Sequence, residues 1–314
     1  MYLKLFEERN LHMNEKKIAI FKLDNNEFEK YYNEKLKEFG CEIFSLDSFL
    51  IVGKNRKPKV NLMKINNINF KKYDLIIVFE VIKLIPFIKC RISKKCKLIL
   101  WNWNKQNSMF ALKAKFISFM CEIWTFDPND AKTYGWKLNN QFYIPDDNLK
   151  QTENINITAF CACLDKGRYC LVKKIRESLL KENVLCDFTL IKDGTSVYSD
   201  QDNFWVKNIG LPYSVFLKHA LQSNIIIDLV QNGQTGLTVR TLEALFYDKK
   251  LITNNVDVAK YPFYRDSNIF IWTNKIDELK LKKFLHGEYK IINASIKEKY
   301  TYKEWLNNFL KNRI

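Results

Sequence analysis

Histidine is scarce in this sequence of 314 residues, and its cysteines lack the spacing of structural metal sites. The chain has three histidines, none next to a cysteine, and its eight cysteines form no C-x-x-C pair. Zinc sites use those ligands at such spacings, so we expect no bound metal. Several cysteines, such as Cys121 and Cys186, lie within apolar runs. Buried, unpaired thiols are typical of a reducing compartment.

Long apolar runs are also missing. No run reaches the ~18 residues that a membrane-spanning helix needs, so the sequence predicts no such helix. Residues 1–17 contain acidic side chains and no long apolar core, which is not the composition of a secretory signal. These features predict a cytoplasmic protein.

Arginine is the rarer of the two basic residues. The chain has 43 lysines, 8 arginines and a formal net charge of +16, and residues 1–150 hold 27 basic and 17 acidic residues. Proteins that read nucleic acids rely on the arginine fork, and the common nucleic-acid-binding motifs are absent, so we expect no nucleic-acid partner. Lysine in bulk suits an anionic membrane surface. The alternative is a lysine-rich composition that has no single target.

Apolar runs alternate with amphipathic segments along the chain. This alternation predicts an α/β fold in which parallel sheets carry helices on both faces. Residues 48–72 predict an irregular connection, and the polar stretch 145–156 predicts a boundary between domains 1–148 and 149–314. Strands are predicted at 17–23, 42–44, 73–79, 97–101, 123–126, 157–163, 187–191 and 224–229, and helices at 25–39, 168–181, 213–220 and 302–311.

The segment QNGQTGLTVRTLEALFYDKKLITNN, which begins at Gln231, predicts a glycine turn, an amphipathic helix and a short strand. A helix that starts on glycine and threonine directs free N–H groups outward, where they can bind phosphate. We therefore take Gly233, Gln234, Thr235 and Gly236 as a candidate phosphate or sugar loop. Arg240 and Glu243 lie about one turn apart on one face. Glu243 either pairs with Arg240 or binds ribose hydroxyls, and spacing alone leaves both interpretations open.

Lys166, Gly167 and Arg168 follow a predicted strand and open the next helix. Cations oppose the helix dipole at this end, so an anion is needed to make them favourable there. Glycine permits close approach of the backbone. This pattern favours contact with phosphate, and the alternative is a solvated, basic start of a helix.

Five motifs are similar to those of a known family. FDPNDAKTYG, LDKGR, LPYS, GQTGLTVRTLEAL and KKLITNN resemble bacterial surface-polysaccharide glycosyltransferases of the GT-B type. The resemblance implies two Rossmann-like domains that face a cleft, with the last helix crossing back to the first domain. It implies that Glu243 binds the donor ribose. It also places Gly236, Thr238 and Arg240 near a nucleotide-sugar, and Lys166 and Arg168 near its diphosphate.

The same resemblance implies a function. It implies inverting transfer of L-rhamnose from dTDP-rhamnose to the lipopolysaccharide core, at the cytoplasmic face of the bacterial inner membrane. It also implies that the enzyme needs no cofactor or metal, because cations and helix dipoles balance the leaving diphosphate. The one D-x-D match, Asp200 to Asp202, lies in a polar linker and is interpreted as a turn.

The first domain is expected to hold the acceptor. Glu80 ends a predicted strand, where side chains face the crevice of an open sheet, and it is our candidate general base. Asp127 is a second candidate, although its place before Pro128 predicts a helix cap. Trp101, Asn102 and Trp103 follow the next strand and are candidates to contact the acceptor.

Three other functions stay open on the sequence alone. One is a glycosyltransferase for capsule or O-antigen with another donor. Another is a basic nucleic-acid-binding module, which the charge suggests and the missing motifs oppose. The third is a non-catalytic fold that supports a membrane assembly.

Overall fold

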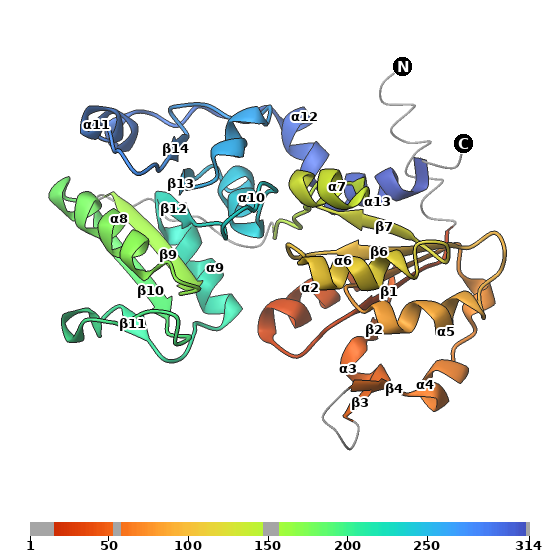
Figure 1. The fold of residues 1–314 in the computed structure, drawn as a ribbon. Helices are drawn as coiled ribbons and strands as arrows, with labels where there is room; N and C mark the ends of the chain where they lie inside the picture. The colour runs from red at the N-terminus through yellow and green to blue at the C-terminus, as the bar shows by residue number, and fades with distance from the viewer. Residues whose placement is uncertain (1–15, 53–57, 147–156, 312–314) are drawn as a thin grey trace. The chain divides into compact units, whose positions relative to one another are not determined.

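The computed structural model describes residues 16–52, 58–146 and 157–311 (Figure 1). The chain divides into two compact units, and it passes from the first to the second between Asn139 and Asn140. The predicted boundary at residue 148 lies in 147–156, outside the described residues. Each unit contains a six-stranded sheet, which confirms the predicted α/β class.

The first unit is built on short, apolar strands. They are β1 (Ile18–Lys22), β2 (Glu42–Ser45), β5 (Leu75–Phe79), β6 (Lys97–Asn102), β7 (Glu122–Thr125) and β8 (Lys137–Leu138). The order across the sheet is β2-β1-β5-β6-β7-β8, and every neighbouring pair is parallel. All of β1 and β5 is buried, as expected for parallel strands that are covered on both faces.

Helices connect these strands. They are α2 (Glu27–Glu38), α3 (Leu46–Phe49), α4 (Leu62–Asn66), α5 (Ile85–Lys89), α6 (Ser108–Lys115) and α7 (Pro128–Tyr134), with short 3-10 turns η1 (Phe70–Lys72) and η2 (Ile82–Leu84). Asp127 caps α7, because its carboxylate accepts hydrogen bonds from the backbone N–H groups of Asn129 and Asp130 at 2.8 and 3.1 Å. The predicted cap is therefore confirmed.

The segment 48–72 is more regular than predicted. β3 (Leu50–Val52) pairs with β4 (Pro58–Val60) in an antiparallel hairpin, and α4 follows directly. Phe49 and Ile65 are buried in the core of the unit. The prediction of an irregular connection is wrong because these elements are too short to show a period among the surrounding lysines and asparagines.

The second unit repeats the architecture. Its strands are β9 (Thr158–Leu164), β10 (Leu185–Ile191), β11 (Val206–Lys207), β12 (Ile225–Asp228), β13 (Lys250–Thr253) and β14 (Ile269–Ile271). They lie in the order β11-β10-β9-β12-β13-β14 and are all parallel. The chain runs outward from β9 to β11, returns to β12, and runs outward on the other side.

Helices cover both faces of this second sheet. They are α8 (Tyr169–Lys181), α9 (Tyr213–Gln222), α10 (Val239–Phe246), α11 (Glu278–His286), α12 (Ala294–Lys297) and α13 (Tyr302–Lys311), with 3-10 turns η3 (Asp200–Asp202), η4 (Val256–Lys260) and η5 (Glu298–Tyr300). Cys161 of β9 shares a core with Val172 of α8. The next side chain back, Phe160, meets Phe216 of α9 with ring centroids 4.7 Å apart. Since neighbouring side chains of a strand point to opposite faces, α8 and α9 lie on opposite sides.

The last helix belongs to the second unit. Tyr302 and Trp305 of α13 pack on Phe142, with ring centroids 5.5 and 4.4 Å apart. The helix has the predicted bounds. Its predicted return to the first domain stays a prediction.

Candidate functional site

The predicted donor residues gather at one point of the second sheet. β9 and β12 are neighbours, and the chain leaves them toward opposite edges of the sheet. Ligands of open α/β sheets bind at the carboxyl ends of such a strand pair, where the two following loops separate. Here those loops hold the predicted residues 166–168 and 234–238 (Figure 1). The structure thus brings together two segments that lie about 70 residues apart in sequence.

Asp165 organises the loop that follows β9. Its side chain is buried and accepts hydrogen bonds from Tyr169 N at 2.7 Å and the Tyr198 hydroxyl at 2.6 Å. Burial acts to raise the pKa of Asp165, but hydrogen bonds, led by that from Ser196, outweigh burial and lower the pKa. The carboxylate is therefore held ionised beneath the loop. The sequence analysis missed Asp165, although a polar residue directly after an apolar strand is a usable signal.

The loop backbone is fixed by a neighbouring segment. Lys166 and Gly167 have positive φ angles of 46° and 76°. Lys166 N donates to Asp193 Oδ2 at 2.7 Å, and Gly167 N donates to Thr195 Oγ1 at 2.8 Å. Both N–H groups are occupied in this conformation. The side chain of Lys166 is exposed, so it is the part of the loop that is open to an anion.

Arg168 ties the two strand ends together. Its Nε donates to the Asp165 carbonyl at 3.0 Å, and its terminal nitrogens donate to the carbonyls of Leu164 and Leu229. One planar guanidinium therefore bridges the ends of β9 and β12. Contact of Arg168 with a diphosphate stays a prediction.

We expect Arg168→Lys to destabilise the second unit, since one ammonium cannot replace a planar fork on three carbonyls. An unpaired buried carbonyl costs about 1–3 kcal/mol, which chemical denaturation can measure. If Arg168 also contacts the diphosphate, the variant will lose more affinity for a nucleoside diphosphate than for the nucleoside. Equal losses for the two ligands would leave only the structural role. Lys174→Gln on α8, the helix that follows Arg168, is the matched control. It should change neither the stability of the second unit nor the affinity for either ligand.

A buried carboxylate also organises the loop after β12. Asp228 ends this strand, and its Oδ2 accepts hydrogen bonds from the hydroxyls of Thr238 and Thr241 at 2.6 and 2.7 Å. Burial raises the pKa of Asp228 although these hydrogen bonds oppose the rise. Thr238 is the N-cap of α10, as its hydroxyl accepts from Thr241 N at 3.1 Å. Asp228 thus fixes the start of the helix, and its place directly after the apolar run Ile225 to Ile227 was an overlooked signal.

Two asparagines that follow β13 form hydrogen bonds with the glycine-containing turn at residues 230–236. Asn254 Oδ1 accepts from Val230 N at 2.7 Å. Asn255 Nδ2 donates to the carbonyls of Thr235 and Gly236, each at 3.3 Å. The motif KKLITNN therefore supports the predicted loop directly. Gln234 and Thr235 are partly exposed, whereas Gly236 is buried.

Glu243 lies in a closed polar cluster on α10. Its carboxylate oxygens both lie 2.6 Å from an Arg240 nitrogen, and Oε1 accepts from the Tyr213 hydroxyl at 2.9 Å. The guanidinium of Arg240 also lies 3.4 Å above the centre of the Phe216 ring. Glu243 is 0% exposed, and burial raises its pKa against the attraction of Arg240.

The structure contains the ion pair between Arg240 and Glu243 that was one of the two open interpretations, and LPYS supplies a third member of the cluster, Tyr213. Since the carboxylate has no exposed surface in this conformation, a ribose would reach it only after Arg240 or Tyr213 moves. The ribose-binding role of Glu243 stays a prediction.

In the first unit, Glu80 follows β5 directly and has an unusual backbone conformation, with φ of 57°. Its carboxylate accepts from Asn104 N and Nδ2 at 2.5 and 3.0 Å and from Gln106 Nε2 at 2.9 Å. Burial raises the pKa of Glu80, although these hydrogen bonds and the charge of Lys22 oppose the rise. A raised pKa suits a general base, as we predicted for Glu80.

Lys22 lies beside Glu80, at the end of β1. Its ammonium pairs with Glu29 and lies 5.3 Å from the centre of a Trp103 ring and 5.6 Å from that of Phe79. Burial lowers the pKa of Lys22 to about 7, although the Glu80 and Asp24 carboxylates act to raise it. The sequence analysis missed Lys22, because nothing in the local pattern separates one strand-end lysine from the many others.

Two of the three predicted acceptor residues are not where we expected them. Trp101 and Asn102 belong to β6 and are completely buried, and Asn102 Nδ2 donates to the Trp124 carbonyl at 3.0 Å. Neither presents a face to a sugar in this conformation, because Trp101 points into the core from the predicted strand and the strand extends one residue further than predicted, to Asn102. Trp103 does follow the strand and is partly exposed.

Other candidate features of the sequence have structural roles. Asp202 of the D-x-D match accepts hydrogen bonds from Tyr169, Lys173 and Trp205, which confirms the interpretation of a turn. The described residues contain no group of three or more His, Cys, Asp or Glu side chains placed to hold a metal ion. Within the described ranges, no helix has the length and apolarity to cross a membrane.

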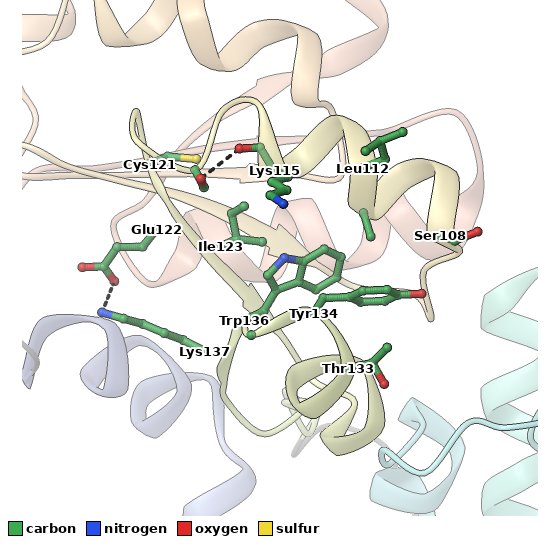
Figure 2. Close-up of a pocket in the computed structure, with 13 residues that line it drawn as sticks. Ser108, Leu112, Lys115, Cys121, Glu122, Ile123, Thr133, Tyr134, Trp136 and Lys137 are labelled. Atoms are coloured by element: carbon green, nitrogen blue, oxygen red, sulfur yellow. Dashed lines mark hydrogen bonds and ion pairs between the residues drawn. The ribbon is translucent and has the colours of Figure 1, made fainter.

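Two large cavities in the described units lie away from these residues. One of about 710 Å³ lies beside α6 and β7 in the first unit (Figure 2). Another of about 630 Å³ lies beside α11 and β14 in the second unit. No predicted site residue lines either cavity, so the switch point of each sheet, rather than cavity size, defines the candidate site.

Comparison with known proteins identifies the fold. No protein-family model and no curated protein matches the sequence. The structure is similar to an alpha-glucosyltransferase in complex with UDP and a 13-mer DNA containing a HMU base, at 13% identity and a TM-score of 0.52, over 94% of this chain and 95% of that one. It is also similar to the lipopolysaccharide outer core galactosyltransferase WaaB, at 13% identity and a TM-score of 0.52, over 95% of this chain and 100% of that one. The chain therefore has the predicted GT-B fold of two Rossmann-like domains.

Proposed function

We propose that the protein is a glycosyltransferase that takes a sugar from a nucleotide-sugar. The observation that carries this proposal is the pair of loops at the β9–β12 switch point, built on buried Asp165 and Asp228, in a chain with the GT-B fold. Nucleotides bind at such points in open α/β sheets. The exposed Lys166 and the start of α10 supply positive potential for a diphosphate.

We propose the lipopolysaccharide core as the acceptor and L-rhamnose, from dTDP-rhamnose, as the sugar. Support comes from the motifs LDKGR, LPYS and GQTGLTVRTLEAL, which resemble those of the lipopolysaccharide core rhamnosyltransferase RfaS. The structural similarity to WaaB points to the same class of acceptor. Phosphorylated core oligosaccharide is anionic, and the net charge of +16 suits it.

The proposed reaction is a direct displacement that inverts the anomeric centre. Glu80 takes the proton of the acceptor hydroxyl as the oxygen attacks C1 of the sugar, and the nucleoside diphosphate leaves with the electron pair of the broken bond. Lys166 and the helix dipole of α10 offset the charge of the leaving group, without a metal or other cofactor. Glu80 belongs to the first unit and the candidate donor loops to the second.

The test is a matrix of donors and acceptors. Purified protein is incubated with UDP-, GDP- and dTDP-sugars and with core lipopolysaccharide, and the mass of each product is measured. We expect a mass increase of one deoxyhexose with dTDP-rhamnose. If product forms only with another donor, or only with capsule or O-antigen acceptors, the protein is a glycosyltransferase but the proposed donor or acceptor is wrong. No product and no nucleotide binding would reject the glycosyltransferase.

A second acceptor class is favoured by one observation. The similar alpha-glucosyltransferase was crystallised with DNA containing a HMU base, and this chain carries the positive charge that a DNA acceptor attracts. We keep lipopolysaccharide as the first choice because lysine outnumbers arginine by 43 to 8. Duplex DNA with hydroxymethylated bases therefore belongs in the same matrix, and transfer to it would replace the proposed acceptor.

A further inference from the structure

Helix α6 and the turn after it carry apolar side chains on their outer side. Four of these side chains are exposed, namely Leu112 at 58%, Met109 at 66%, Phe116 at 72% and Phe119 at 77%. They are spaced three or four residues apart, and at 100° per residue they fall on one side of the helix and turn. A helix that only covers a sheet carries polar side chains there. The core-facing side is also apolar, since Ala114 is completely buried.

Positive charge borders this apolar row. By helical geometry, Lys113 and Lys115 lie on either side of it. Both lysines are exposed, and neither has an ion-pair partner among the residues that the structure describes. No acidic residue occurs from Lys105 to Cys121. An apolar stripe flanked by lysines, without acidic residues, matches the interface of a membrane whose headgroups are anionic.

The cavity of about 710 Å³ in the first unit opens beside the same helix. Leu112 and Lys115 line it on one side, and Tyr134, Trp136 and Lys137 line it on the other (Figure 2). Lys137 pairs with Glu122 at 3.2 Å, whereas Lys115 has no ion-pair partner in the described part of the chain. Aromatic rings with an unpaired ammonium suit the headgroup region, where tyrosine and tryptophan are usually enriched.

We propose that α6 and residues 116–120 form the surface that binds an anionic lipid bilayer. Phe116 and Phe119 enter the boundary between headgroups and acyl chains, while Lys113 and Lys115 extend to the phosphates. Lipid is favoured over a protein partner because the row has cations on both sides and no carboxylate. This proposal deepens the proposed function, since a lipopolysaccharide acceptor lies in such a membrane.

The test is sedimentation with vesicles in the absence of any nucleotide-sugar. Wild-type protein should bind vesicles of phosphatidylglycerol and phosphatidylethanolamine and leave phosphatidylcholine vesicles unbound. Phe116→Ser with Phe119→Ser should weaken binding at least tenfold, because burial of each ring is lost. Lys113→Gln and Lys115→Gln should each weaken it about fivefold at low salt. Leu279→Ser with Ile291→Ser is the matched control, since these side chains of the second unit are 82% and 84% exposed.

Several outcomes overturn the proposal. The membrane surface is rejected if the Phe116 and Phe119 double variant binds anionic vesicles as well as the wild type, or if the Leu279 and Ile291 control loses as much affinity. It is also rejected if wild-type protein binds neutral vesicles as well as anionic ones. A double variant that changes self-association but not vesicle binding would reject it too. Transfer to deacylated, soluble core oligosaccharide separates this inference from the function, because the phenylalanine pair should retain it. If wild-type protein binds vesicles but transfers no sugar, the membrane surface stands and the proposed function fails.

Discussion

Glu80→Gln should reduce sugar transfer by roughly 10²- to 10⁴-fold, which is the usual contribution of a general base. Glutamine keeps the shape of the side chain beside Asn104 and Gln106 but accepts no proton from the acceptor. Donor affinity should not change, because the donor loops belong to the second unit. Turnover is measured by product mass and donor affinity by calorimetry. The matched control is Glu42→Gln, which removes an exposed ion pair with Lys72 and should turn over normally.

The pH profile gives an independent check of the same residue. The reactive form of Glu80 is the carboxylate, and burial raises its pKa above that of an ordinary glutamate. Activity should therefore fall as the pH drops through this raised pKa, at a higher pH than for an exposed glutamate. Asn104→Ala removes a hydrogen bond that stabilises the carboxylate, so it should move this limb to still higher pH. If the acidic limb of the pH profile does not move in Asn104→Ala, or if Glu80→Gln turns over like the wild type, Glu80 is not the general base.

Glu243→Ala should destabilise the second unit by about 1–3 kcal/mol, because it leaves the partly buried Arg240 guanidinium and the Tyr213 hydroxyl without their acceptor. Arg240 would lose both contacts of 2.6 Å, and the Tyr213 hydroxyl would lose its acceptor. Chemical denaturation followed by tryptophan fluorescence measures the change. Arg240→Met combined with Glu243→Leu should recover part of the loss, because it removes both charges together. A double variant no more stable than Glu243→Ala would show that the pair is not the cause.

Glu243→Gln separates stability from donor binding. Glutamine keeps the length of the side chain and an acceptor for Tyr213, so the loss of stability should be smaller than with alanine. If Glu243 binds the ribose, a nucleoside should bind this variant more weakly than the wild type at a temperature where both are folded. Unchanged nucleoside affinity would leave Glu243 as a structural residue.

The sequence was informative where a strand or helix is long and periodic. The apolar runs at 73–79 and 224–229 predicted β5 and β12 within two residues. The Asp127–Pro128 pair predicted the start of α7, because capping needs only neighbouring residues. The strand–loop–helix order predicted that the two candidate donor loops follow β9 and β12. These features depend on local physics, which one sequence records.

Contacts between segments that are distant in the sequence could not be predicted from it. No spacing rule joins Tyr213 to Glu243 or Asp165 to Tyr198, because each pair meets only after the sheet has assembled. The error at Asn102 has a related cause, since a strand that continues one residue further than predicted turns an expected loop side chain into a core side chain. Burial of Glu243 was also not foreseen, because a polar residue on an amphipathic helix is usually placed on its outer side.

Arg168 and Asn255 have a consequence for how a nucleotide is received. Between them they fasten both flanks of the turn at 229–236 to strand ends. A loop that hydrogen bonds hold in one conformation loses little backbone entropy when a ligand binds. Under the proposed function, a diphosphate would therefore meet a preorganised loop, whereas a ribose would reach Glu243 only after Arg240 or Tyr213 moves.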